Sequence, residues 1–177
     1  MINPFIENKT GKILQDAGLY SHPINVVACA EYFSIKIDYL LLEDGISGFF
    51  VKKDSEMRIA INSEHNILRQ RFTIAHELGH YVLHRNEESL FIDKGEKVMY
   101  RDLKSTSGEY RREREANAFA AALLMPEDLI DKEVRLYLND NQHVYNIVDY
   151  LAAEKFHVSS QAMAFRLSNL GYELGMF

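Results

Sequence analysis

Cysteine and proline are scarce in this chain of 177 residues, which has one cysteine, three prolines and no tryptophan. The single cysteine, Cys29, excludes an internal disulfide, and we expect its side chain to be buried in a core, as suits a reducing compartment. The start of the chain, Met1-Ile-Asn-Pro-Phe5, lacks the charged segment and apolar run of a signal peptide, and no apolar run is long enough to cross a membrane. We therefore expect a cytoplasmic protein.

Basic residues are fewer than acidic ones: 20 lysines and arginines against 26 aspartates and glutamates give a net charge of −6. The segment from Val158 to Leu167 is similar to the second half of a helix-turn-helix, which would suit a DNA-binding regulator. Acidic side chains nevertheless outnumber basic ones over residues 142–177, with Lys155 and Arg166 against Asp149, Glu154 and Glu173. A DNA-binding surface needs a basic stripe, so we expect no direct contact with nucleic acid.

Apolar spacing and turn residues predict an α+β fold, with strands early and helices late. Two helices should come first, from Asn3-Pro4 to about Gly18 and from Pro23 to Phe33. Three short strands follow at Ile35–Tyr39, Ile46–Lys52 and Met57–Ile61. Tight turns at Asp44-Gly45 and Lys53–Glu56 would join them into a small three-stranded antiparallel sheet. The later helices are expected at 64–84, 110–125, from Pro126, at 142–156 and from Ser159 to Gly171.

Length and composition predict a single domain over residues 1–177, since 47% hydrophobic residues are ample for one core. Its N-terminal helices and sheet would occupy residues 1–62. The helices that carry the motif described next would occupy 63–125, and a C-terminal helical part would occupy 126–177.

Residues 76–80 read His-Glu-Leu-Gly-His, which is the most informative pattern in the chain. On a helix, His76 and His80 lie one turn apart on one face, where two imidazoles can bind the same metal ion. Glu77 would project about a hundred degrees round the helix, where its carboxylate can act on water at the metal. The motif indicates zinc-activated hydrolysis, and a chance pair of histidines on a surface helix is the alternative. Gly79 costs about 1 kcal/mol in mid-helix, which suggests close approach by another segment or by substrate.

Catalytic zinc normally takes three protein ligands, so a third ligand should lie elsewhere. His84 would lie roughly 12 Å along the helix from His76, too far to share the ion, and we expect it at the surface or near the helix dipole. In the predicted helix 110–125, Glu113 shares a face with Asn117, whose amide could hold a histidine ligand in place. An ordinary charged helix, with Glu113 and Glu115 paired to neighbouring arginines, is the alternative.

The wider pattern resembles the ImmA/IrrE family of bacterial metallo-endopeptidases, which have a zincin core. The resemblance starts at about residue 20 and is carried by Ala60-Ile-Asn62, Arg71-Phe-Thr-Ile-Ala75 with the motif, Glu113-Arg-Glu-Ala-Asn117 with Phe119–Pro126, and Phe156–Gly171. It implies one zinc per chain, held by His76, His80 and Glu113, with Glu77 as the catalytic residue. Glu115 also adjoins the Ala-Asn pair, but the layout of similar metallopeptidases favours Glu113.

The resemblance implies a zinc-dependent endopeptidase that cleaves a helix-turn-helix transcriptional repressor and so relieves repression in mobile-element or stress regulation. The alternative is a zinc-containing module that binds a protein without cutting it, such as a toxin-antitoxin or anti-repressor partner. A sheet edge at Ile46–Lys52 could receive extended substrate, with Gly48 allowing close approach, although core packing is the alternative. A second oxyanion stabiliser is not assigned, and the candidates by residue type alone are Tyr81, Tyr100, His143 and Arg166.

Overall fold

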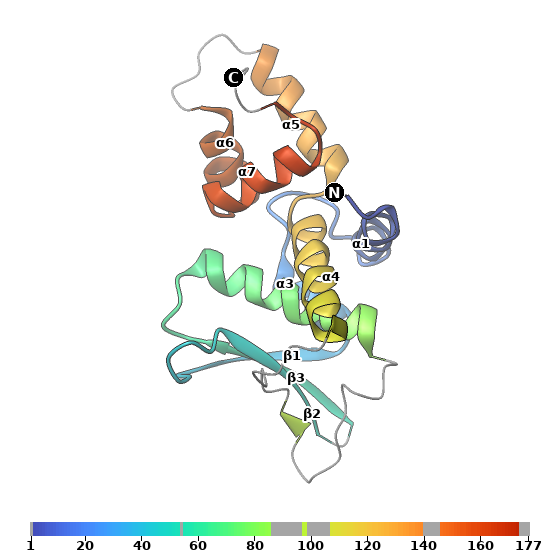
Figure 1. The fold of residues 1–177 in the computed structure, drawn as a ribbon, viewed down its shortest axis with the longest axis vertical. Coiled ribbons are helices and arrows are strands. Elements are labelled where there is room, and N and C mark those ends of the chain that lie inside the picture. Colours follow the sequence, from blue (N-terminus) through green and yellow to red (C-terminus); the bar gives the residue numbers. More distant parts are fainter. Residues whose placement is uncertain (1, 54, 86–96, 99–106, 140–145, 174–177) are drawn as a thin grey trace. The chain divides into compact units, whose positions relative to one another are not determined.

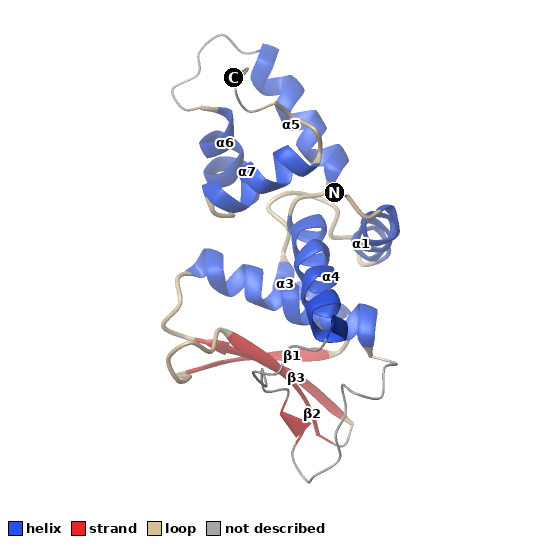
Figure 2. Cartoon of the chain, viewed as in Figure 1, coloured by secondary structure: helices blue, strands red, loops and turns tan. Residues whose placement is uncertain are grey.

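The protein is represented by a computed structural model, which describes residues 2–53, 55–85, 97–98, 107–139 and 146–173. Helices and a sheet are both present, so the α+β prediction is confirmed (Figures 1 and 2). The elements in chain order are α1 (Pro4–Asp16), α2 (Val26–Tyr32), β1 (Ile35–Leu40), β2 (Gly48–Lys53), β3 (Glu56–Asn62), α3 (Ile67–His84), β4 (Lys97–Val98), α4 (Ser107–Leu124), α5 (Glu127–Asn139), α6 (Ile147–Asp149), the π-helix η2 (Tyr150–Phe156) and α7 (Ser160–Asn169).

The chain divides into two compact units. Residues Val26–Ala120 form one, called here the sheet unit, and Met1–Asn25 with Ala121–Phe177 form the other, called the helical unit. No described helix of either unit is both long and apolar enough to cross a membrane. The single-domain organisation over residues 1–177 stays a prediction.

The sheet is mixed, so the prediction of a three-stranded antiparallel sheet was wrong. Its strand order is β1-β3-β2-β4, with β1 parallel to β3 and both β2 pairings antiparallel. The predicted turn between Lys53 and Glu56 does join the β2–β3 hairpin. The other predicted turn, at Asp44-Gly45, joins no pair of adjacent strands, because residues 41–47 carry the chain past β3.

Long-range contacts explain this order better than local turn chemistry does. Asn62, at the end of β3, donates from its side-chain amide to the Ile46 carbonyl at 3.0 Å, and its backbone N–H bonds the Ser47 carbonyl at 2.9 Å. These bonds fix the connecting segment beside β3. The consecutive buried residues Ile59, Ala60 and Ile61 also suit a central strand, because such strands read as continuous apolar runs.

Helix α3 packs on the sheet and presents its other side to α4. It begins at Ile67, where the Asn66 side chain accepts a hydrogen bond from the Arg69 backbone at 2.9 Å and so caps the first turn. Its Ile74, Ala75 and Leu78 side chains are buried, and these join the apolar side chains of β3 in the core. The layer order of sheet, α3 and α4 places the α3 motif between the sheet and α4.

The helical unit is built from α1, α5, α6 with η2, and α7, around a core that includes Leu14, Ile130 and Phe156. Asn3 caps α1 through a bond from the Phe5 backbone at 3.1 Å, and Ser159 caps α7 as predicted, through a bond from Ala162 at 3.1 Å. The helix predicted at 142–156 is described from Ile147 onward, as α6 and η2.

Candidate metal centre

Helix α3 places two histidine side chains together because they lie four residues apart on one helical face. His76 and His80 are only 8% and 5% exposed, and their ring centroids are 4.6 Å apart. The two Nε2 atoms lie 3.0 Å from each other. Both rings therefore direct the same nitrogen to one point.

Helix α4 brings a carboxylate to that point. The Glu113 oxygens lie 3.2 Å from Nε2 of His80 and 3.5 Å from Nε2 of His76. Ligands about 2.0–2.1 Å from a tetrahedral zinc ion would lie roughly 3.3 Å from each other, so the observed spacings fit a shared ion. Within the described part of the chain, His76, His80 and Glu113 are the one cluster of potential ligands that converges in this way.

Asn117 lies one turn after Glu113 and contacts the first histidine. Its side-chain oxygen is 3.0 Å from Nδ1 of His76. An amide oxygen can only accept, so Nδ1 carries a proton, and in the neutral imidazole Nε2 then keeps its lone pair. This tautomer is the one a metal ligand needs, and the bond also fixes the plane of the ring.

Glu115 and His84 lie together and are not part of the convergent group, although the His84 ring centroid is 5.8 Å from that of His80. Glu115 forms an ion pair with Arg111 at 3.3 Å, and its other oxygen is 3.6 Å from Nε2 of His84. His84 is 2% exposed, so the surface alternative was wrong, while its place in the last turn of α3 agrees with the alternative of a position near the helix dipole. The reason is that α4 covers this end of α3 and supplies an acidic neighbour to the imidazole.

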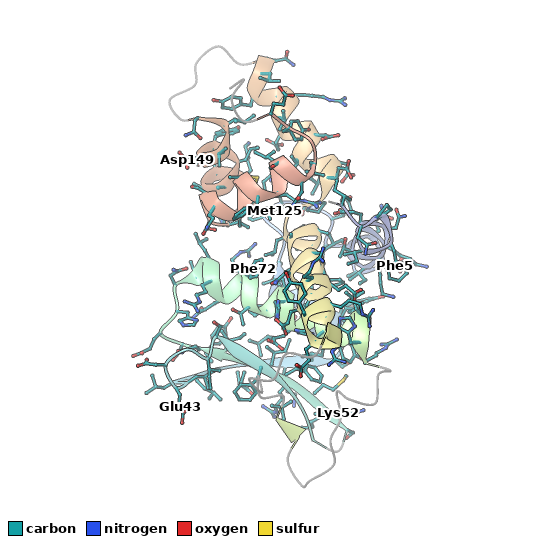
Figure 3. The ribbon with its side chains drawn as sticks, in the orientation of Figure 1. Phe5, Glu43, Lys52, Phe72, Met125 and Asp149 are labelled. Atoms are coloured by element: carbon teal, nitrogen blue, oxygen red, sulfur yellow. The ribbon has the colours of Figure 1, made fainter. Side chains whose placement is uncertain are left out.

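Glu77 directly follows His76 on α3 and is 7% exposed. Its position in the chain places a carboxylate in the same helical turn as the first imidazole. Phe72, labelled in Figure 3, lies one turn before His76, and its ring centroid is 6.5 Å from that of the histidine. The i, i−4 spacing of Phe72 from His76 is a signal in the sequence that could have placed its ring beside the histidine.

Gly79 sets how closely the two helices approach. A Cβ built on this residue would lie 3.1 Å from the Cα and the carbonyl oxygen of Ala116 and 3.1 Å from the Cβ of Phe119. The expected close approach by another segment is thereby confirmed, and that segment is the backbone of α4. Because Ala116 lies between Glu113 and Asn117, this contact positions both of these side chains.

The remaining sequence candidates have other roles. Tyr81 packs between aromatic rings, with centroids 5.7 Å from Phe33 and 5.5 Å from Phe50. Arg166 belongs to the helical unit, where its guanidinium binds both Glu7 oxygens at 2.6 and 2.8 Å. Tyr100 and His143 fall outside the described residues.

The predicted substrate edge at Ile46–Lys52 does not fit the sheet. Strand β2 lies between β3 and β4, and Val51 and Lys52 pair with Val98 and Lys97. The close approach at Gly48 comes from the protein itself, because a Cβ there would lie 2.6 Å from the Ala60 carbonyl oxygen and 2.8 Å from a Thr73 methyl carbon.

Comparisons with known proteins show what this chain is similar to. A model of the IrrE N-terminal-like domain, a peptidase family, matches residues 30–168. The chain is 32% identical over 108 residues to the uncharacterized immunity region protein 2 of Bacillus phage phi105, covering 61% of this chain and 63% of that protein. It is 26% identical over 111 residues to the metallopeptidase ImmA of Bacillus subtilis, covering 63% of this chain and 56% of that protein. The matches thus span less than two thirds of each relative.

A solved structure has a similar fold. The structure of a Mycobacterium tuberculosis transcriptional regulator superposes with a TM-score of 0.65 over 94% of this chain and 47% of that one, at 16% identity. At this level of identity the likeness shows the fold alone.

Proposed function

Because the chain belongs to the ImmA/IrrE peptidase family, whose IrrE N-terminal-like domain matches residues 30–168, we propose that it is a zinc-dependent endopeptidase. The observation that carries the proposal is the convergence of His76, His80 and Glu113, with donor atoms 3.0 to 3.5 Å apart. Two neutral imidazoles and a carboxylate are a ligand set found in catalytic zinc sites, where a fourth position stays open. One zinc ion per chain follows from this arrangement.

The chain's own residues divide the work of hydrolysis. When bound, zinc supplies Lewis acidity that acidifies water and polarises a carbonyl. Glu77 accepts a proton from the water as its oxygen attacks the peptide carbonyl carbon, and it returns the proton to the amine as the C–N bond breaks. Asn117 keeps His76 in the tautomer that leaves Nε2 unprotonated. Glu113, and not Glu115, completes the ligand set.

The proposed substrate is a helix-turn-helix transcriptional repressor, cut so that repressed genes are expressed. The names of the relatives support this choice, since one is a metallopeptidase called ImmA and the other belongs to a phage immunity region. The net charge of −6 would also attract a basic DNA-binding protein. Such a substrate places the activity in the cytoplasm and in mobile-element or stress regulation, without direct contact between this chain and DNA.

The test is to incubate the zinc-loaded protein with the repressor encoded beside its gene and to identify products by mass spectrometry. We expect one cleavage site in the repressor and little action on casein. Glu77→Gln should abolish cleavage and keep the zinc, since Glu77 acts on water and is not a ligand. The matched control Glu115→Gln removes a nearby carboxylate charge and should keep the activity.

Different failures have different meanings. Cleavage by Glu77→Gln at the rate of the unmodified protein would remove this residue from the mechanism, and loss of zinc from that variant would make it a ligand. Zinc binding without cleavage of any neighbouring regulator would favour a zinc-containing binding module. Broad degradation of casein would contradict the regulatory substrate.

A further inference from the structure

Strand β1 is an outer strand of the sheet. In the order β1-β3-β2-β4 it pairs with β3 on one side, and no strand of the described chain pairs with its other side. An outer strand presents unpaired backbone N–H and C=O groups, which is a template for addition of another strand. At six residues, Ile35–Leu40 is long enough to pair.

The end of β1 exposes apolar side chains. Tyr39 is 48% exposed, Leu40 is 46% exposed, and Leu41, directly after the strand, is 74% exposed. At the other end of the strand Ile35 is 1% exposed. Successive side chains of a strand alternate between its two faces, so Tyr39 lies on the face of Ile35 and Ile37, and Leu40 lies on the face of Lys36 and Asp38.

The charges of β1 favour pairing with an identical strand in one register. Directly opposing residues of an antiparallel pair point to the same face of the sheet. When one residue lies opposite its own copy, so that the pairing is centred on it, the helix-covered faces of both sheets therefore lie on the same side. Centring on Lys36 or on Asp38 places like charges opposite each other. Centring on Ile37 places Lys36 opposite the partner's Asp38, and the two-fold axis repeats that pair.

The same register matches the charge pattern of the neighbouring strand. On the sheet face that carries Lys36 and Asp38, Lys36 lies 3.4 Å from Glu56 and Asp38 binds Arg58 at 2.9 Å. Both charges of β1 therefore already belong to a network in which acidic and basic side chains alternate. A second copy extends that network across the junction. On the other face, the half-exposed Tyr39 lies opposite the partner's Ile35 in this register.

We propose that this chain forms a two-fold dimer in which β1 pairs antiparallel with β1 of a second copy, centred on Ile37. The pairing makes one continuous sheet from the two copies. It does not depend on the metal centre or on the proposed function. The other possible occupant of this edge is an extended segment of a different protein. A third case is an edge without a partner, because a lysine on an outer strand can also serve to prevent pairing.

Charge exchange tests this pairing directly. Light scattering after size-exclusion chromatography should give the unmodified protein twice the 20.5 kDa chain mass. Lys36→Asp and Asp38→Lys should each give the mass of one chain, because each places like charges opposite each other. A mixture of the two variants should return to the dimer mass, since every opposing pair is then Lys with Asp.

Two controls make the outcomes decisive. Lys132→Asp makes the same charge change at an exposed position of α5 and should stay dimeric. Circular dichroism of each variant, together with recovery on mixing, separates a lost interface from a lost fold. The proposal is overturned if the unmodified protein has the mass of one chain, which would leave the edge to another protein or to none. Single variants as dimeric as the parent, or folded variants that fail to associate when mixed, would also overturn it.

Discussion

Replacing Gly79 with alanine tests how the proposed metal centre is assembled. The added Cβ would lie 3.1 Å from two backbone atoms of Ala116 and from the Cβ of Phe119, whereas carbon atoms pack best at about 3.5–4.0 Å. None of these atoms can rotate away, so α4 must shift. Alanine gains about 1 kcal/mol over glycine in a helix, and overpacking costs about 1–3 kcal/mol. The net change is a loss of stability of roughly 0–2 kcal/mol.

A matched glycine isolates the packing effect. Gly11 lies within α1, where an added Cβ would meet only a Tyr20 ring carbon at 3.9 Å, an ordinary contact. Gly11→Ala should therefore raise the free energy of unfolding in urea by up to about 1 kcal/mol. Gly79→Ala should also weaken zinc binding by roughly tenfold or more, because α4 carries Glu113 and Asn117. If Gly79→Ala raises the free energy of unfolding as much as Gly11→Ala does and leaves the zinc affinity unchanged, the described α3–α4 contact is wrong.

Two further predictions concern single side chains. Asn117→Ala should lower zinc affinity roughly 10- to 100-fold in titration calorimetry, and unchanged affinity would remove its orienting role. Burial raises the pKa of Glu133, but ion pairs with Lys155 and His22 outweigh burial and hold this pKa below its usual range. Because the pKa is lowered in the folded protein, the ionised carboxylate stabilises the fold at pH values above it. Lys155→Met should therefore destabilise most near neutral pH, with a deficit that shrinks as the pH falls through the Glu133 pKa. The exposed Lys132→Met should show no such pH dependence in urea unfolding.

The local part of the site could be predicted from the sequence. The spacing of His76 and His80 determines their common face as soon as the segment is helical, and the apolar stripe predicted a helix close to the observed Ile67–His84. A glycine in mid-helix likewise indicated close packing before the neighbour was known. These inferences depend on residues within one or two helical turns.

The rest depends on how distant segments meet. Spacing within α4 left Glu113 and Glu115 both open, because only the packing of α4 on α3 decides which carboxylate lies near Nε2 of His80. The same packing buries His84. The sheet order was mispredicted because the Asp44-Gly45 sequence is typical of hairpin turns, while Asn62, nearly twenty residues later, holds the connection beside β3.

Zinc titration of the metal-free protein by calorimetry tests the central claim most directly. We predict one site per chain, abolished by the double variant His76→Ala/His80→Ala and weakened by Glu113→Ala, with Glu115→Ala close to the unmodified protein. Full zinc binding by the folded double variant would contradict the proposed centre, and a greater loss with Glu115→Ala than with Glu113→Ala would contradict the assignment of the third ligand.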